Sequence, residues 1–245
     1  MKTVGVIPAR MASTRFPCKV LAKIGGKPMI QWVWEKARGA KRLDEIMIAC
    51  DHQDVLAAAR SFGAIAVMTN PAHPSGTDRI AEAIGQHTCD IIINIQGDEP
   101  FIDVLTIDSL AHMMQQDSAV MMGTVVKAII SKEEFENPNV VKCVLDENGY
   151  ALYFSRAPIP YQRDQSGSAG LRYKHLGLYG YRKDFLMQYK NWPKSTLEGI
   201  EQLEQLRVLE KGYRIKTVVT EYESIAIDTP DDLRKAEAWL QKQSN

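Results

Sequence analysis

Short apolar runs alternate with amphipathic stretches through the first half of the chain. The apolar runs predict strands at residues 3–8, 45–50, 64–68 and 90–95. Apolar side chains at helical spacing predict helices at residues 29–40, 53–62, 78–86 and 104–115. Strands that alternate with helices in this way predict an α/β fold, with a mostly parallel central sheet and helices on both faces.

The pattern changes after residue 119. Strand-like segments follow with fewer helices between them, at residues 120–130, 140–145, 151–155 and 173–182. Helices are then expected at residues 197–210 and 231–241, with a strand at residues 214–220 between them. No low-complexity linker and no internal repeat divides the chain. We therefore predict one domain over residues 1–245, with a core of residues 1–119 and 211–245 and a smaller β-rich lobe of residues 120–210.

Composition narrows the possible partners. Hydrophobic residues make up 45% of the 245 positions, which is enough for one sizeable core. Thirty basic residues balance thirty acidic ones, so a nucleic-acid partner is not expected. No apolar run approaches the roughly 20 residues that span a bilayer, and the first residues form no signal region, so we expect a cytoplasmic protein without a membrane partner. Four scattered cysteines without a C-x-x-C pair suggest reduced thiols.

Two aspartates stand where apolar runs end. Asp98 follows the run in IIINIQGDEP, and Asp228 follows the run in SIAIDTP. Ligands of open α/β folds gather at the carboxyl edge of the sheet, so both carboxylates are candidates for a magnesium and polyphosphate site. Spacing alone does not establish that they converge. Asp228 could instead cap the helix that the following T-P-D-D sequence predicts.

The loop after the first strand, PARMASTRFPCK, carries three cations. Arg10, Arg15 and Lys19 lie within ten positions of one another, with hydroxyls at Ser13 and Thr14. Guanidinium and ammonium groups bind phosphate oxygens, so this loop is a candidate nucleotide-binding segment. The loop lacks the glycines of the dinucleotide and Walker-type motifs, which disfavours an NAD-dependent oxidoreductase. The alternative is an ordinary solvated loop.

The segment HPSGTDRIAE precedes a predicted helix. Gly76 permits close backbone approach, and free amides at a helix start attract anions or the polar edge of a base. The alternative is a simple helix cap, formed by Thr77 or Asp78.

The second half supplies polar groups among apolar ones. Arg156 and His175 could pair with a substrate carboxylate, and Glu204 and Gln205 could bind hydroxyls. For His175 the alternative is a satisfied core histidine. For Glu204 it is a surface pair with Arg207, three residues along the same helix.

Taken together, these segments resemble the CMP-Kdo synthetase (3-deoxy-manno-octulosonate cytidylyltransferase) family. The resemblance runs in order through IPARMASTRFPCK, GGKPMIQWVWEKA, HPSGTDRIAEA, NIQGDEPFI, ALYFSRAPIPY, KHLGLYGYRKDFL, LEQLRVLEKG and AIDTPDDL. It implies a glycosyltransferase-A-like (Rossmann-like) core and a homodimer formed through the β-rich lobe. It also implies a Mg²⁺-dependent reaction of CTP with Kdo (3-deoxy-D-manno-octulosonic acid) that gives CMP-Kdo and pyrophosphate for lipopolysaccharide or capsule. A related acid, either 8-amino-Kdo or a sialic-type sugar, is the alternative substrate.

The resemblance also assigns roles to residues. Asp98 and Asp228 would bind Mg²⁺, and Lys19 and Arg15 would complete the catalytic set by stabilising charge on the leaving pyrophosphate. The CTP site would comprise Pro8, Ala9, Arg10, Ser13, Arg15, Lys19, Ser75, Gly76, Arg79 and Gln96. The sugar-acid pocket would comprise Arg156, His175, Tyr179, Glu204 and Gln205.

Three positions depart from the family pattern. Cys18 stands where a glycine is usual in the first loop, and would be strained if that position requires a positive φ. His52 replaces a second aspartate after the second strand, and Ala226 replaces a glycine two residues before Asp228.

Overall fold

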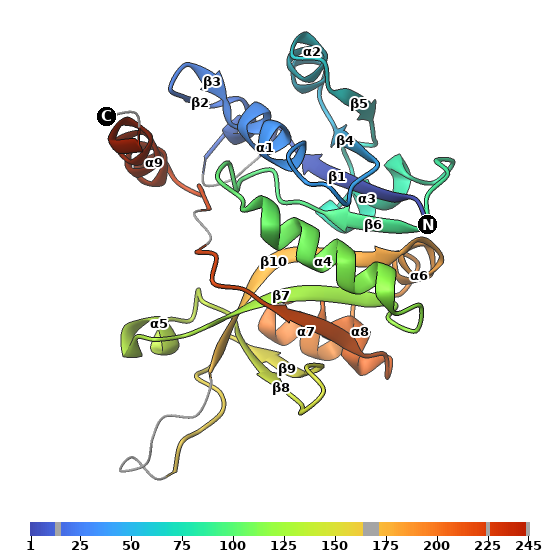
Figure 1. Ribbon diagram of the computed structural model, residues 1–245, viewed down its shortest axis with the longest axis vertical. Coiled ribbons are helices and arrows are strands. Elements are labelled where there is room, and N and C mark those ends of the chain that lie inside the picture. Colours follow the sequence, from blue (N-terminus) through green and yellow to red (C-terminus); the bar gives the residue numbers. More distant parts are fainter. Residues whose placement is uncertain (13–15, 164–171, 224–225, 244–245) are drawn as a thin grey trace.

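The computed structural model describes residues 1–12, 16–163, 172–223 and 226–243, which are built around one twisted sheet (Figure 1). The main strands lie side by side in the order β11-β7-β10-β6-β1-β4-β5. In chain order they are β1 (Thr3–Ala9), β4 (Glu45–Cys50), β5 (Ile65–Met68), β6 (Ile91–Asn94), β7 (Met122–Ala128), β10 (Tyr173–Arg182) and β11 (Ile215–Val219). Among these strands only β10 runs antiparallel to its neighbours, so the sheet is mixed and mostly parallel.

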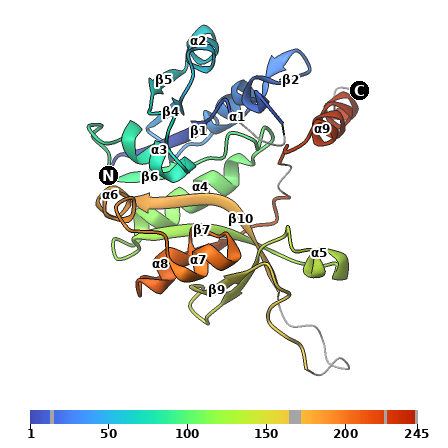
Figure 2. The same cartoon turned by 180° about the vertical axis from the view of Figure 1, so that it is seen from behind.

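Helices cover both faces of the sheet, as the alternating pattern predicted. One face carries α1 (Met29–Ala37), α2 (Gln53–Ser61) and α4 (Val104–Gln116), and the opposite face carries α3 (Gly76–Ala83), α6 (Lys183–Tyr189) and α8 (Leu206–Glu210) (Figures 1 and 2). Successive strand residues point to opposite faces. Ile91 and Ile93 therefore join the first core, whereas Ile92 joins the second.

Residues 120–210 do not form a sheet of their own. Strands β7 and β10 lie inside the central sheet, and only β8 (Lys142–Leu145) and β9 (Ala151–Ser155) extend it beyond β10. This segment also contains α5 (Lys132–Glu136), α6, α7 (Thr196–Glu201) and α8. The boundary expected near residue 120 therefore falls within one continuous sheet.

The single helix expected at residues 197–210 is two helices, α7 and α8. Gln202 separates them with a left-handed φ of 53°, a conformation that ends a helix. The break allows Leu203 to enter the core, and it places Glu204 and Gln205 on the cavity described below.

The last helix, α9 (Pro230–Gln243), packs away from the main sheet. It covers a small hairpin of β2 (Lys23–Ile24) and β3 (Lys27–Pro28), beside the short 3₁₀ helix η1 (Lys19–Leu21). A third apolar cluster joins these elements, formed by Ile24, Met29, Phe101, Ile227 and Ala236. Within the described residues, no helix has the length and apolar content needed to cross a membrane.

Candidate active site

Three neighbouring parallel strands end at one edge of the sheet, and the loops that follow them form the candidate site. Arg10 follows β1, Asp51 follows β4, and the Gln96–Asp98 turn follows β6. This turn packs directly on β1, because a Cβ on Gly97 would lie 2.8 Å from the Pro8 carbonyl oxygen. Only glycine allows so close an approach, so Gly97 fixes the place from which Asp98 projects.

Asp98 and Asp228 converge on Lys19. The Lys19 ammonium donates to Asp98 Oδ2 at 2.8 Å and to Asp228 Oδ1 at 2.9 Å. A backbone hydrogen bond of 2.9 Å from the Ile227 nitrogen to the Asp98 carbonyl oxygen holds the two segments together. Burial alone would lower the pKa of Lys19, but attraction and hydrogen bonds from the two carboxylates outweigh it and raise that pKa. Lys19 is therefore a cation held between two acids that are distant in sequence.

Asp228 is not the cap of α9. The Thr229 hydroxyl accepts a hydrogen bond from the Asp232 backbone nitrogen, and the Asp232 carboxylate accepts from the Thr229 nitrogen. This reciprocal pair forms a capping box and satisfies the helix start. The Asp228 carboxylate is thereby left to bind Lys19.

A cavity of about 320 Å³ lies beside these groups. Seven of the residues expected to bind CTP line it, namely Pro8, Arg10, Lys19, Ser75, Gly76, Arg79 and Gln96. Asp98 and Glu204 also line it. Ala9 is instead fully buried within β1, and Ser13 and Arg15 lie outside the described residues.

The Ser75 hydroxyl is the cap of α3. It accepts from the Asp78 nitrogen at 3.1 Å and donates to the Asp78 carboxylate at 2.7 Å. The helix therefore begins at Gly76, and neither Thr77 nor Asp78 is the cap. Thr77 has another role, because its hydroxyl donates to Glu204 Oε2 at 3.0 Å and so links α3 to the loop before α8.

Arg79 is committed to a buried ion pair. Its guanidinium donates to Asp51 Oδ2 at 2.9 Å and to the Thr69 hydroxyl at 2.6 Å, and its side chain is only 3% exposed. Asp51 Oδ1 accepts from the Met11 nitrogen at 2.8 Å. This pair therefore holds the start of the first loop, and the bonds to Asp51 and Thr69 use two of the five N–H donors of Arg79. His52, the neighbouring departure from the family pattern, caps α2.

A second cavity, of about 230 Å³, adjoins the first. His175, Tyr179, Glu204 and Gln205 line it, as the sugar-acid prediction expected. Gly76, Gln96 and Glu204 border both cavities. Gln96 is held in place by its side-chain nitrogen, which donates to the Gly177 carbonyl at 3.0 Å.

Arg156 is not brought to this cavity. Its guanidinium donates to the carbonyl oxygens of Glu201 and Pro138 at 2.8 and 3.1 Å. None of the described residues that line the second cavity is a lysine or an arginine. Arg156 therefore does not supply the expected cation for a substrate carboxylate in this conformation.

His175 is not a cation either. Burial lowers the pKa of its imidazole to about 3, so the ring is neutral near pH 7. The Thr124 hydroxyl donates its hydrogen to the Leu178 carbonyl at 2.8 Å, so His175 Nε2, at 2.9 Å, donates to the Thr124 oxygen. In the ligand-free protein His175 therefore offers no positive charge to a carboxylate, and its place in the sugar-acid pocket stays a prediction.

This buried imidazole predicts a loss of stability in mild acid. Since the folded pKa lies below the unfolded value of about 6.5, the contribution of neutral His175 is complete above that pH and is lost as the pH falls. We expect the slope to rise from about half of 1.4 kcal/mol per pH unit at pH 6.5 toward about 1.4 near pH 5, measured as the free energy of unfolding in urea. His175→Gln should flatten this slope, and the same change at the exposed His112 should not. Equal slopes in both variants would refute the assignment.

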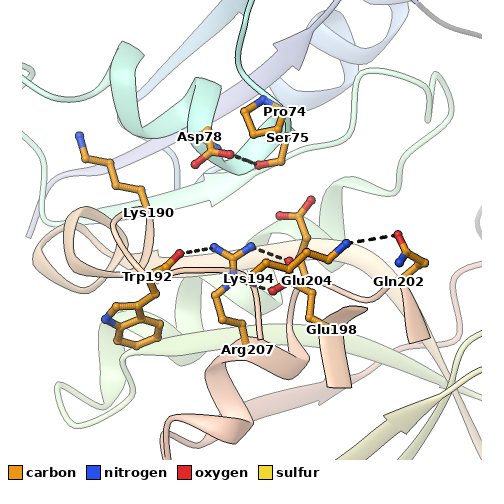
Figure 3. Close-up of a pocket in the computed structure, with 10 residues that line it drawn as sticks. All are labelled: Pro74, Ser75, Asp78, Lys190, Trp192, Lys194, Glu198, Gln202, Glu204 and Arg207. Carbon is orange, nitrogen blue, oxygen red and sulfur yellow. Dashed lines mark hydrogen bonds and ion pairs between the residues drawn. The ribbon is translucent and has the colours of Figure 1, made fainter. Parts of the chain in front are cut away.

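Glu204 stands at the junction of three cavities. Burial raises the pKa of its carboxyl group, while the Thr77 hydrogen bond partly opposes the shift. Figure 3 shows the third cavity, of about 510 Å³, which Glu204 shares with Lys194, Trp192 and other side chains. Arg207 pairs there with Glu198, at 2.7 and 2.5 Å, so the alternative surface pair with Glu204 does not form.

Comparison with known proteins identifies the family of this chain. Residues 4–217 match the family model described as "Cytidylyltransferase". A 3-deoxy-manno-octulosonate cytidylyltransferase of Geotalea uraniireducens is 49% identical over 99% of this chain and 100% of its own length. The chain belongs to the 3-deoxy-manno-octulosonate cytidylyltransferase family.

Other relatives of the cytidylyltransferase family match equally broadly. The protein of the same description from Solibacter usitatus is 51% identical and covers 96% of this chain and 92% of its own. A solved structure described as CMP:2-keto-3-deoxy-manno-octonic acid synthetase complexed with CTP is 41% identical. It superposes with a TM-score of 0.95 and covers 99% of this chain and 100% of its own.

One departure of this cytidylyltransferase from the family pattern has a local energetic cost. Cys18 has φ 56° and ψ 24°, the left-handed conformation that glycine adopts freely. A side chain in this region costs about 1–2 kcal/mol, and glycine's extra entropy in the unfolded chain offsets part of that amount. We expect Cys18→Gly to raise the free energy of unfolding in urea by about 0.5–1 kcal/mol. Cys18→Ala, which keeps the β carbon, should give no gain, and a glycine variant no more stable than the alanine variant would contradict the strain.

Several residues of the site escaped the sequence reasoning. Asp51 follows an apolar strand just as Asp98 does, so the same signal could have identified it. Thr77 and Asn94 line the second cavity, and Thr124 bonds His175 there, but nothing in the local sequence distinguishes these side chains. Their roles depend on contacts between segments that are distant in sequence.

Proposed function

We propose that the chain transfers the cytidylyl group of CTP to Kdo, giving CMP-Kdo and pyrophosphate. The observation that carries this proposal is the convergence of Asp98, Asp228 and Lys19 beside the cavity with the expected CTP residues. The names of the full-length relatives support the choice of CTP and of Kdo.

The two adjoining cavities suggest how the substrates meet. The triphosphate would lie in the first cavity, where Arg10 and Lys19 supply positive charge. The sugar acid would lie in the second. The attacking hydroxyl and the α-phosphorus would then come together at the shared border, beside Gln96 and Glu204.

The second cavity offers hydrogen-bond donors for a polyhydroxylated sugar. The side-chain nitrogen of Gln205 is buried and has no hydrogen-bond partner in the described structure. A buried donor left unpaired costs about 1–3 kcal/mol, a cost that a sugar hydroxyl or carboxylate would relieve. Burial also raises the pKa of Tyr179, so its phenol stays protonated and remains a donor.

The donor set at the first cavity fits Mg²⁺. Asp98 and Asp228 present two hard carboxylate oxygens to one position, and Mg²⁺ commonly uses one or two carboxylates together with substrate phosphates. No cluster of three or more acidic, histidine or cysteine ligands occurs among the described residues, so phosphate oxygens would complete the coordination. When bound there, Mg²⁺ would screen the charges of nucleotide and sugar acid and favour ionisation of the attacking hydroxyl.

The protein's own groups would position and stabilise the reacting atoms. The sugar hydroxyl attacks the α-phosphorus while the bond to pyrophosphate breaks, so no covalent enzyme intermediate is needed. Arg10 and Lys19 would stabilise the negative charge that grows on the departing pyrophosphate. Gln96, fixed on the Gly177 carbonyl, would orient the ligands on both sides of the border.

A pyrophosphate-release assay tests the proposal. CTP, UTP and ATP are each offered with Kdo, 8-amino-Kdo and a sialic acid, in the presence of Mg²⁺. We expect release with CTP and Kdo to exceed every other combination. A clear preference for another acid would support the alternative substrate, and no release with any acid would overturn the reaction class.

The homodimer suggested by the family resemblance remains part of the proposal. Leu152, on the β8–β9 extension, is 60% exposed to solvent. A second copy of the chain could cover this surface. Light scattering coupled to size-exclusion chromatography should give twice the chain mass of 27.5 kDa. A mass of one chain at micromolar concentration would refute the dimer.

A further inference from the structure

The Lys19 ammonium lies directly between the two proposed metal ligands. It is 2.8 Å from Asp98 Oδ2 and 2.9 Å from Asp228 Oδ1. The lysine side chain is 12% exposed, whereas the carboxylates are 29% and 37% exposed. The cation therefore approaches the pair from the protein side, and the acids face the solvent.

We propose that Lys19 is a built-in counterion that competes with divalent cations for Asp98 and Asp228. This inference rests on the proposed metal role of the two aspartates. In the nucleotide-free protein, the ammonium offsets one of the two negative charges of the pair and lowers its affinity for a free divalent ion. The phosphates of the nucleotide then draw the ammonium away and open the carboxylates to the ion.

The distances explain why lysine and metal exclude each other. Magnesium binds carboxylate oxygens at about 2.1 Å, so an ion shared by Asp98 and Asp228 would need the space that the ammonium fills. The two cations would also repel each other at this short separation. Both cannot share the same pair of oxygens.

The structure also allows the ammonium to move while its backbone stays fixed. Val20, the next residue, is buried in the core, and the Leu21 nitrogen donates to the Cys18 carbonyl at 2.9 Å. The four-carbon stem of lysine is flexible. Lys19 and Arg10 both line the first cavity, so a triphosphate bound there offers the ammonium a competing set of anionic oxygens.

The test measures Mn²⁺ binding to the nucleotide-free protein by electron paramagnetic resonance of the free ion. We expect Lys19→Met to bind Mn²⁺ about tenfold or more tightly than the wild type, because a unit charge at hydrogen-bond distance is removed from both ligands. Lys19→Arg keeps the charge and should stay within about threefold of the wild type. The double variant Lys19→Met/Asp98→Asn should lose the gain, which would place the ion on the aspartates.

If Lys19→Met binds Mn²⁺ no more tightly than the wild type, the counterion role is overturned. Lys19→Gln, which retains a donor without the charge, gives the same comparison if the methionine variant does not fold. Because no nucleotide, sugar or turnover enters the measurement, its failure is separate from failure of the proposed reaction, which the pyrophosphate assay decides.

Discussion

Asp98→Asn should lower the rate of pyrophosphate release by about a thousandfold or more while leaving the fold intact. The amide has nearly the same shape as the carboxylate but lacks the charge that would bind Mg²⁺. The backbone bond from the Ile227 nitrogen to the Asp98 carbonyl does not involve the side chain and should persist. Steady-state release with saturating CTP and Kdo measures the loss, and circular dichroism monitors the fold.

Asp231→Asn is the matched control for Asp98→Asn. Asp231 lies at the exposed start of α9 and pairs with Arg234 and Lys235, away from the Lys19 ammonium. Its neutralisation should leave turnover close to that of the wild type. An Asp98→Asn enzyme within about fivefold of the wild-type rate would remove Asp98 from the catalytic set.

Asp51→Ala should lower the free energy of unfolding by about 3–5 kcal/mol, since it leaves the buried Arg79 guanidinium without its counterion. The Met11 nitrogen would also lose its acceptor at the start of the first loop. Urea denaturation at pH 7 measures the loss of stability. The KM for CTP should rise as well, because the loop that carries Arg10 and Lys19 loses this support.

A double replacement of Asp51 and Arg79 distinguishes the loss of their ion pair from the loss of side-chain packing. The double variant Asp51→Leu/Arg79→Met removes both charges together and should be considerably more stable than Asp51→Ala. If Asp51→Ala costs less than about 1 kcal/mol, the buried pair does not stabilise the loop. If the double variant is the less stable, packing rather than charge dominates at this position.

The sequence predicted the parallel part of the sheet because hydrophobic periodicity is a local property. Strands β1, β4 and β6 and helices α1, α2 and α4 lie close to their expected ranges. The placement of β10 was not predictable in this way. Its alternating pattern shows a strand with two faces, but not that it runs antiparallel between β6 and β7. That insertion is what joins the expected lobe to the core.

Because sequence patterns are local, the structure brings some of the predicted site residues together and leaves others apart. Asp98 and Asp228 could be singled out because each follows an apolar strand, and the structure brings both to Lys19. Arg156 has the same polar character as residues that line the cavities, yet its guanidinium donates to the backbone carbonyls of Glu201 and Pro138. Which polar group faces a cavity depends on the packing of distant segments, and no local pattern encodes it.

The backbone link between Ile227 and Asp98 also bears on the order of events during synthesis. The ribosome delivers β1, β4, β6 and the turn that carries Asp98 long before it delivers Asp228. A nascent chain can therefore have a nearly finished scaffold and still hold only half of its acidic pair. The pair of Asp98 and Asp228 would be completed only when α9 emerges and docks on the β2–β3 hairpin.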